Sequence, residues 1–351
     1  MDLEGIRERL LQDSLEAFLV SKGENIRYLS GFTGSSAFIL VGHGTSFFIT
    51  DPRYEEQASQ EVSSGFDLVV LRPGERLSDF IKAKGWTSLA VEDSLSLAQY
   101  HALQEGLEGK VALKVWKGVV EMMRRIKESW EVEEIKGAVA LAQDAYYSVR
   151  EMVRPGTVER DLALELEFTM RRRGAEGVAF PFIVASGPRS AMPHGEASER
   201  VMEEGDLVVL DFGAKWKGYH SDMTRTFVLG FWKDWAREIY RVVLEAQEAA
   251  LEAIRPGVMA RDVDAVARGI IEEAGYGEYF GHGLGHGVGL EIHEAPALAP
   301  TSRDVLEVGV VFTVEPGIYI PGKGGVRIED LVYLGDHGPE LLTDLPKEVM
   351  D

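Results

Sequence analysis

Short apolar runs separated by amphipathic stretches dominate the first third of the chain. The runs at 38–41, 46–50, 67–71 and 88–91 end near glycine, proline or acidic residues, so each predicts a strand. The Gly-His-Gly sequence at 42–44 predicts that the first two strands are neighbours joined by a tight turn. Because helical stretches alternate with these strands, we predict a small α/β domain.

A longer amphipathic helix is predicted from about residue 130 to residue 153. Its apolar residues recur at helical spacing: Ile135, Val139, Ala142 and Tyr146. The domain boundary is expected just before this helix. We therefore predict an N-terminal domain over residues 1–122 and a C-terminal domain over residues 123–351.

The C-terminal region contains an internal repeat. Arg154-Pro155-Gly156 and Arg160-Asp161 recur as Arg255-Pro256-Gly257 and Arg261-Asp262. Each copy opens an amphipathic helix, preceded by a turn that proline and glycine mark. Further along each copy, an apolar run that follows a glycine ends at an acid, Asp211 in the first and Glu315 in the second. We predict a duplicated half-domain with a carboxylate from each half near a pseudo-two-fold axis; chance similarity of two strand-rich segments is the alternative.

The segment from 206 to 230 predicts a β-hairpin with Lys217-Gly218 at its turn. A two-residue loop pairs Asp211 with Thr224, which places Asp222 on the same face and diagonally adjacent to Asp211. Two neighbouring carboxylates repel unless a cation lies between them. The alternative is that one of the two acids caps an element or faces solvent.

A second hairpin is predicted from 310 to 333, around a loop at 321–325 whose register the sequence leaves open. A register that pairs Glu315 with Leu331 would place Glu329 diagonally beside Glu315, as in the first hairpin. Acids are rarely buried without a partner. The two glutamates therefore indicate a bound cation, an ion pair with Arg327, or both.

Between the hairpins lies a glycine-rich segment, 281–294, with five glycines in nine positions. These glycines allow the backbone to approach a ligand closely. The same segment holds His282, His286 and His293, which together indicate function, whereas His194 alone would be read as a loop histidine. Nucleotide binding is rejected because neither a Gly-Lys-Ser/Thr sequence nor a dinucleotide fingerprint is present.

The chain thus offers four carboxylates and one imidazole as metal ligands: Asp211, Asp222, His286, Glu315 and Glu329. Such a set can be buried together only if cations neutralise it. The pattern therefore predicts a two-metal hydrolytic site.

Composition narrows the class of partner and the compartment. The 351 residues include 58 acidic and 37 basic side chains, a net charge of −21, which argues against nucleic acid and anionic membranes as partners. The chain has no cysteine, which excludes disulfides and thiolate chemistry and fits a reducing cytoplasm. No signal peptide and no apolar run of transmembrane length is recognised, so a cytoplasmic protein is expected.

These motifs resemble those of the pita-bread metallopeptidases, which include aminopeptidase P, prolidase, methionine aminopeptidase and creatinase. The similar segments are 193–195, 211–214, 221–226, 282–294, 313–317 and 327–330. Residues 25–35 resemble the creatinase-type N-terminal domain of Xaa-Pro peptidases. The resemblance implies an α/β (α+β) protein with a small N-terminal creatinase-type domain and a C-terminal pita-bread domain that contains the pseudo-two-fold repeat.

The resemblance also implies roles for individual residues. Asp211 would bind one metal and His286 the other, and Asp222, Glu315 and Glu329 would contribute to one or both. Glu315 would carry a proton from the attacking water to the leaving nitrogen. The remaining roles concern substrate and support: His194 and His293 would orient substrate and stabilise the tetrahedral intermediate, His282 would contact substrate, and Arg327 would hold the ligand carboxylates. Two divalent ions are implied, manganese or cobalt first, with zinc or iron as alternatives.

The implied substrate is a short peptide with a free amino terminus and proline second, whose Xaa-Pro bond is a tertiary amide without an N–H. We expect an aminopeptidase P-like enzyme, with a prolidase restricted to dipeptides as the alternative. A non-catalytic peptide-binding pseudo-peptidase is the distant alternative. Methionine aminopeptidase is disfavoured by the additional N-terminal domain. The resemblance implies a homodimer and no nucleic-acid or membrane partner.

Overall fold

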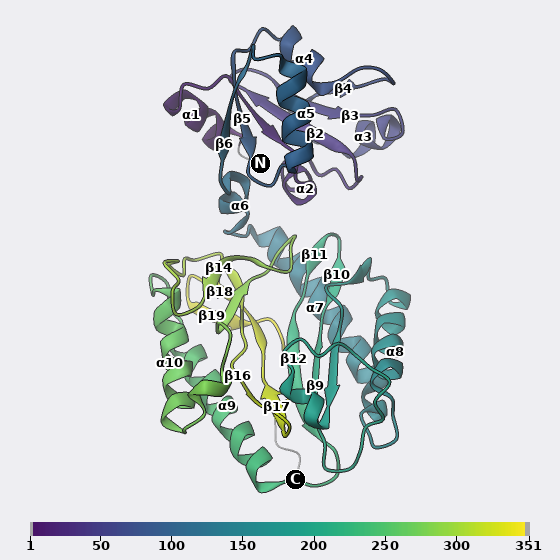
Figure 1. Cartoon of the computed structure of the whole chain (residues 1–351), viewed down its shortest axis with the longest axis vertical. Coiled ribbons are helices and arrows are strands. Elements are labelled where there is room, and N and C mark those ends of the chain that lie inside the picture. Colours follow the sequence, from purple (N-terminus) through teal and green to yellow (C-terminus); the bar gives the residue numbers. More distant parts are fainter. Residues whose placement is uncertain (1–2, 348–351) are drawn as a thin grey trace. The chain divides into compact units, whose positions relative to one another are not determined.

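The computed structural model describes residues 3–347 of the chain. These residues form two compact units that meet in the sequence between Arg124 and Arg125 (Figure 1). The predicted division into residues 1–122 and 123–351 lies beside this point. Within residues 3–347, no helix is long and apolar enough to cross a bilayer.

A six-stranded mixed sheet forms the centre of the N-terminal unit, in the order β4-β3-β2-β1-β5-β6. Its strands are β1 (Ala17–Val20), β2 (Ala37–Gly42), β3 (Ser46–Thr50), β4 (Asp67–Val70), β5 (Ser88–Glu92) and β6 (Ala112–Trp116). The helices of this unit are α1 (Glu4–Gln12), α2 (Gly23–Ser30), α3 (Glu55–Glu61), α4 (Leu77–Ala83), α5 (Leu97–Leu107) and α6 (Val119–Arg124).

The strands that the apolar runs predict are therefore confirmed, and β2 and β3 form the expected antiparallel pair. Consecutive residues of a strand face opposite sides of a sheet. Phe18 and Leu19 of β1 accordingly belong to two different apolar clusters, and both residues are fully buried. The central strand is thus covered on both faces, as in other α/β domains.

The C-terminal unit has two pairs of long helices with strands between them (Figure 1). Its helices are α7 (Ser129–Val149), η1 (Arg150–Met152), α8 (Glu159–Arg172), η2 (Gly187–Ala191), α9 (Asp234–Ala253), α10 (Ala260–Glu273) and η3 (Gly277–Tyr279). Helix α7 packs with α8, and α9 packs with α10. The predicted buried face of α7 is confirmed, because the four apolar residues that define it are all buried.

The strands of this unit form several small antiparallel sheets. They are β7 (Gly177–Val178), β8 (Ile183–Ser186), β9 (Leu207–Phe212), β10 (Ala214–Trp216), β11 (Tyr219–His220), β12 (Met223–Val228), β13 (Gly285–Gly287), β14 (Glu294–Leu298), β15 (Val311–Val314), β16 (Gly317–Ile320), β17 (Gly324–Arg327), β18 (Asp330–Gly335) and β19 (Gly338–Leu341). The sheet orders are β11-β10-β7, β12-β9-β8, β14-β13-β15-β18-β19 and β16-β17.

The internal repeat is visible in the backbone as well as in the sequence. Gly156 and Gly257 have φ values of 92° and 87°, and each precedes the second helix of its pair by the same number of residues. A positive φ favours glycine because it has no Cβ. Gly205 and Gly309, which precede the two acids of the repeat, also have positive φ values, 79° and 96°. The two halves therefore share turn geometry at matching positions.

The first hairpin has the register that its turn predicts. Lys217 and Gly218 form a two-residue loop, and their φ values of 45° and 82° are those of a turn with both central residues in the left-handed region. Asp211 pairs with Thr224 across β9 and β12, as expected. Asp222 immediately precedes β12 and is thereby placed diagonally from Asp211.

The register of the second hairpin, which the sequence left open, differs from the one considered above. Leu331 pairs with Thr313 rather than with Glu315, because Ile320 pairs with Gly324 and the loop contains only three residues. The ladder is also interrupted: β15 and β18 pair on one side of the break, and β16 and β17 pair on the other. The same register holds on both sides, so Glu315 and Glu329 lie opposite each other in the break rather than diagonally.

Candidate active site

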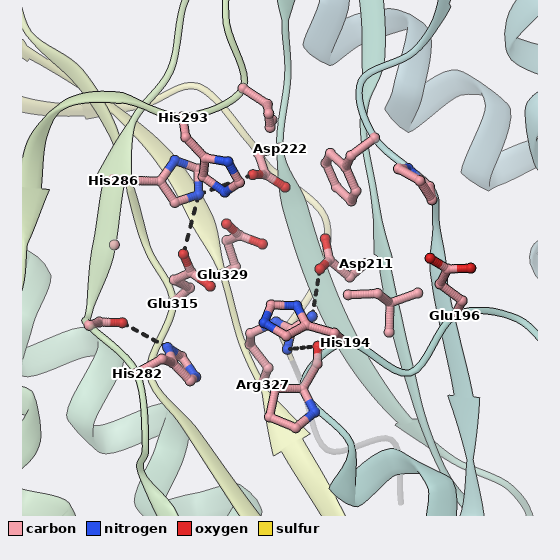
Figure 2. Close-up of a pocket in the computed structure, with 17 residues that line it drawn as sticks. His194, Glu196, Asp211, Asp222, His282, His286, His293, Glu315, Arg327 and Glu329 are labelled. Carbon is pink, nitrogen blue, oxygen red and sulfur yellow. Dashed lines mark hydrogen bonds and ion pairs between the residues drawn. The ribbon is translucent and has the colours of Figure 1, made fainter. Parts of the chain in front are cut away.

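One pocket of about 400 Å³ in the C-terminal unit contains every site residue that the sequence predicts (Figure 2). These residues are His194, Asp211, Asp222, His282, His286, His293, Glu315, Arg327 and Glu329. They come from segments more than 100 residues apart in the sequence, and the two halves of the repeat both contribute. A volume of this size is typical of a site for a small ligand.

The five metal-ligand candidates lie in strands or at the ends and interruptions of strands. Asp211 is near the end of β9, and His286 is in β13. Glu315 follows β15, and its backbone N–H donates to the carbonyl of Leu284 rather than to its hairpin partner. Glu329 lies between β17 and β18, and its N–H donates to the carbonyl of Thr224. The flanking ladders fix the backbones of these residues.

Carboxylate oxygens that could bind a metal lie around the imidazole of His286. Its Nε2 is 3.5 Å from Asp222 Oδ2 and 3.4 Å from Glu315 Oε1. One ligand atom from each of Asp222, His286 and Glu329 lies within 4.8 Å of the others. Figure 2 shows these side chains pointing toward a common space beside Asp211.

The hydrogen-bond pattern of His286 directs one nitrogen into this cluster. Nδ1 lies 3.0 Å from the carbonyl oxygen of Gly287, which can only accept, so Nδ1 carries the proton. Burial lowers the pKa of His286, which favours the neutral ring. The Nε2 lone pair then faces two carboxylate oxygens, an arrangement that is favourable when a cation lies among them.

Two buried carboxylate oxygens lack a partner. Within the part of the chain that the structure describes, Oδ1 of Asp211 and Oδ1 of Asp222 have no hydrogen bond. Buried polar atoms are almost always satisfied, so such atoms need an explanation. Both belong to the predicted ligands, and oxygen atoms of carboxylates are the ligands that hard divalent cations prefer.

Burial opposes the ionisation of three acids of the cluster, Asp222, Glu315 and Glu329. Burial raises the pKa of Asp222 and of Glu329 well above the usual range, and the charges of neighbouring carboxylates raise it further. Burial likewise raises the pKa of Glu315. A divalent cation would reverse this by neutralising the charges. The unpartnered oxygens, the orientation of His286 and the donor types therefore fit a metal centre.

Arg327 connects the cluster to the other side of the pocket. It is buried, and its Nη2 donates to Asp211 Oδ2 at 2.5 Å. Its Nη1 donates to the Tyr319 hydroxyl at 2.8 Å, and its Nε donates to Thr224 Oγ1 at 3.1 Å. The sequence left open an ion pair between Arg327 and Glu315 or Glu329, whereas the structure forms the ion pair with Asp211.

The three other histidines surround the cluster. The rings of His286 and His293 have centroids 4.3 Å apart, and burial lowers the pKa of His293. His282 Nε2 lies 3.0 Å from the Tyr319 hydroxyl, and its Nδ1 lies 2.7 Å from the Gly283 carbonyl oxygen. His194 is exposed, and it lies beside Arg327 in Figure 2, on the opposite side of the pocket from His293.

The structure also adds residues that the sequence pattern did not reveal. Four apolar residues, here called the apolar wall, also line the pocket: Phe180, Pro181, Ile183 and Ile292. Glu196 lines it as well. Their residue types are common in ordinary strands and loops. The sequence could have indicated them only by position: Glu196 lies two residues after His194, and Ile292 directly precedes His293.

Glu159 is a buried acid that supports the His194 loop from behind. Its side chain has no exposed area, and its Oε1 accepts from the Ser186 N–H and hydroxyl, each at 2.7 Å. Its Oε2 accepts from the Ser198 hydroxyl at 2.6 Å and from Arg189 Nε at 3.0 Å. Ser186 and Ser198 flank the loop that contains His194, so one carboxylate holds both ends of that loop.

Two family models match the chain. The model of metallopeptidase family M24 matches residues 133–336, and that of the Creatinase/Prolidase N-terminal domain matches residues 3–126. The first match alone covers more than half of the sequence and contains all of the site residues described above.

Several relatives and solved structures are similar over almost the whole chain. An Xaa-Pro dipeptidase of Pyrococcus horikoshii is 40% identical, and the match covers 98% of this chain and 97% of the relative. The structure of an Xaa-Pro dipeptidase from Bacillus anthracis has a TM-score of 0.94 at 44% identity, covering 99% of this chain and 98% of the other. An X-Pro aminopeptidase from Thermotoga maritima has a TM-score of 0.88 at 42% identity, covering 98% and 99%. The chain therefore belongs to metallopeptidase family M24, the pita-bread metallopeptidases, and carries a creatinase/prolidase-type N-terminal domain.

Proposed function

We propose that this protein is a metal-dependent Xaa-Pro dipeptidase, which hydrolyses the bond before proline in dipeptides. The observation that carries the proposal is the convergence of four carboxylates and His286 in one pocket. The similarity over nearly the whole chain to Xaa-Pro dipeptidases supports the choice of substrate. The size of the pocket suits a small ligand such as a dipeptide.

The metal ligands in this proposal are the five cluster residues: Asp211, Asp222, His286, Glu315 and Glu329. An oxygen-rich set with one imidazole suits manganese or cobalt first, with zinc or iron as alternatives. Two divalent cations held there would neutralise the carboxylates, polarise the scissile carbonyl and lower the pKa of the attacking water.

Glu315 is the residue we assign to proton transfer. Burial raises its pKa, so its carboxyl group holds a proton more readily than an exposed glutamate does. Thr313 Oγ1 donates to its Oε1 at 3.2 Å, which fixes the orientation of the carboxylate. Glu315 can therefore accept a proton from water and donate it to the proline nitrogen, which must be protonated before it leaves.

The histidines are assigned to the substrate. His293 has a lowered pKa and is thus a neutral donor at neutral pH, suited to the oxygen on which negative charge develops. His194 lies at the opposite side of the pocket, where it can orient the peptide. His282 is fixed between Gly283 and Tyr319 as a further contact, and Arg327 keeps Asp211 in place.

An Xaa-Pro aminopeptidase acting on longer peptides is the second candidate. The sequence placed it first, and the similarity to an X-Pro aminopeptidase of Thermotoga maritima supports it. The two candidates share the metal centre and differ in whether the leaving side of the pocket admits residues after proline.

The test is hydrolysis by the full chain after reconstitution with manganese or cobalt, with Leu-Pro, Leu-Pro-Ala and a longer Leu-Pro peptide as substrates and Leu-Ala as the control. We expect release of leucine from Leu-Pro alone. Release from the longer peptides would replace the dipeptidase by the aminopeptidase. If no proline peptide is cleaved with either metal, the enzyme proposal fails and a peptide-binding role takes its place.

We also propose that the protein is a homodimer, as the resemblance implies. Light scattering of the purified full chain should give twice the mass of one chain. A monomeric mass at micromolar concentration would contradict this proposal.

A further inference from the structure

We propose that Glu196 makes the active site prefer peptides whose first residue is basic, such as Lys-Pro and Arg-Pro. This inference rests on the proposed function and names the substrate class of the same pocket. It concerns the side chain of the first residue, which is the part that varies among Xaa-Pro substrates.

Glu196 is held at the pocket by its backbone. An isolated β-bridge pairs it with Ile183 of the apolar wall, and Arg189 donates a hydrogen bond to its carbonyl oxygen. The residue itself is exposed and lines the pocket, as do Phe180 and Pro181. Figure 2 places its carboxylate beyond Asp211, away from His286 and Glu315.

The charge of Glu196 is available to a ligand. Within residues 3–347 its carboxylate has no hydrogen bond or ion pair, whereas Arg327 holds Asp211 and Thr224 holds Glu329. Glu196 also stands apart from the carboxylates that surround His286 (Figure 2). It is therefore an acid of the pocket that the metal centre does not use.

An acid beside an apolar wall matches the shape and chemistry of a lysine or arginine side chain. The methylene groups of such a side chain pack on apolar surface while the charged end remains near water and pairs with the carboxylate. The proline ring is neutral and identical in every substrate, so an interaction of Glu196 with this ring would not distinguish one Xaa-Pro substrate from another. His282 lies on the opposite side of the pocket from Glu196 (Figure 2).

The experiment compares Lys-Pro with norleucyl-proline, which keeps the length of the lysine side chain but replaces its ammonium group by a methyl group. In the manganese-loaded full chain we expect kcat/KM to be about two- to fivefold higher for Lys-Pro, as for an exposed ion pair. Glu196→Gln should reduce this ratio toward one, and Glu196→Lys should favour Glu-Pro over Gln-Pro. High salt should weaken the wild-type preference.

Glu199→Gln is the matched control, because Glu199 is an exposed acid of the same loop that pairs with Arg160 and does not line the pocket. It should leave the ratio unchanged. The inference is overturned if Glu196→Gln keeps the wild-type ratio. It is also overturned if Glu196→Gln lowers both substrates equally, since Glu196 would then act on a group common to all substrates, such as the amino terminus.

Different results would contradict the role of Glu196 and the proposed peptidase activity. Cleavage of both peptides without any preference overturns the role of Glu196 and leaves the proposed function intact. If the wild type cleaves only longer peptides, the ratio is measured on Lys-Pro-Ala and norleucyl-Pro-Ala. Absence of cleavage of all these peptides overturns the proposed function, and the role of Glu196 with it.

Discussion

At the scale of single residues, Asp222 is a buried acid whose charged form is unstable without a cation nearby. Its side chain is buried, and its Oδ1 has no partner within the described residues. Burial first, and then the charges of Glu329 and Asp211, raise its pKa. An ionised Asp222 is therefore stable only beside a positive charge, whereas an amide at the same position would need none.

We expect Asp222→Asn to lower kcat/KM by at least about 100-fold and to reduce the bound metal, since a ligand is lost. Without metal, the variant should unfold at the same temperature as the metal-free wild type or above it, because a buried ionisable group is gone. Metal analysis, kinetics and calorimetry on one preparation test this. Asp336→Asn, at an exposed loop position, is the control. Wild-type activity and metal content in Asp222→Asn would contradict the metal site.

The sequence predicted the residues of the cluster because acids at the ends of apolar runs conflict with the usual rules of burial. Asp211 and Glu315 stood out for that reason, and the histidines stood out by their number in a glycine-rich segment. Glu196 and Glu159 could not be found in this way. An acid in a loop or in the first turn of a helix is normally exposed, and only the folded chain shows that Glu159 has no exposed side-chain area.

At the scale of elements, the accuracy of prediction depended on the loops. The first hairpin could be predicted because its two-residue turn at Lys217 and Gly218 allows one register. The second contains a glycine-rich loop that fits several registers, and the observed three-residue loop shifts the pairing by two residues. Its break could not be predicted either, since it arises from hydrogen bonds of Glu315 and Glu329 to distant segments.

Glu159 supports a prediction about the loop that contains His194. In Glu159→Gln one carboxylate oxygen becomes an amide group, which cannot accept from all of the present donors. We expect a loss of about 1–3 kcal/mol in the free energy of unfolding. We also expect a lower kcat/KM with unchanged metal content, because the loop moves and the ligands do not. Glu165→Gln, on the exposed side of α8, is the control. Loss of metal together with activity would show that Glu159 acts on the cluster instead.

Asp330 connects its own strand, β18, to β12, α9 and the C-terminal segment, and its stability contribution depends on pH. It accepts from Arg225 at 2.8 Å, from Gln247 at 2.7 Å and from Lys347 at 2.5 Å. Burial opposes ionisation, but the charges of Arg225 and Lys347 outweigh it and hold the pKa of Asp330 below its usual value. A lowered folded pKa means that the stabilisation is present above the unfolded pKa, about 4, and is lost as the pH falls through the folded pKa.

Asp330→Asn should therefore destabilise the protein by about 3–5 kcal/mol at neutral pH, because Arg225 is left buried without its anion. The difference in the free energy of unfolding between wild type and variant should be constant from pH 5 to pH 7 and shrink below about pH 4. Urea unfolding across this range measures it. A difference that grows on acidification would contradict the assignment of the ion pair.

At the scale of the whole molecule, the C-terminal unit places ligands from its two halves in one pocket. Asp211 and Asp222 belong to the first half of the repeat, and His286, Glu315 and Glu329 belong to the second. The glycines with positive φ at matching positions indicate that both halves keep the same turns. Ionised carboxylates repel one another, so bringing the two halves together destabilises the fold when these acids are charged. A bound cation removes this repulsion.

The repulsion among the carboxylates predicts how metal removal changes stability with pH. Burial raises the pKa of Asp222, Glu315 and Glu329 in the metal-free fold. A folded pKa above the unfolded value means that stability is present at low pH and is lost as the pH rises through the folded pKa. Cations bind the deprotonated ligands, so the metal-loaded protein avoids this loss of stability. Manganese at 100 times its Kd should add about 2.7 kcal/mol to the free energy of unfolding. The increase in Tm between EDTA and manganese should therefore widen from pH 5.5 to pH 7.5, as calorimetry can measure. An equal increase at every pH would mean that the buried carboxylates are already ionised without metal, which would contradict the electrostatic account of the site.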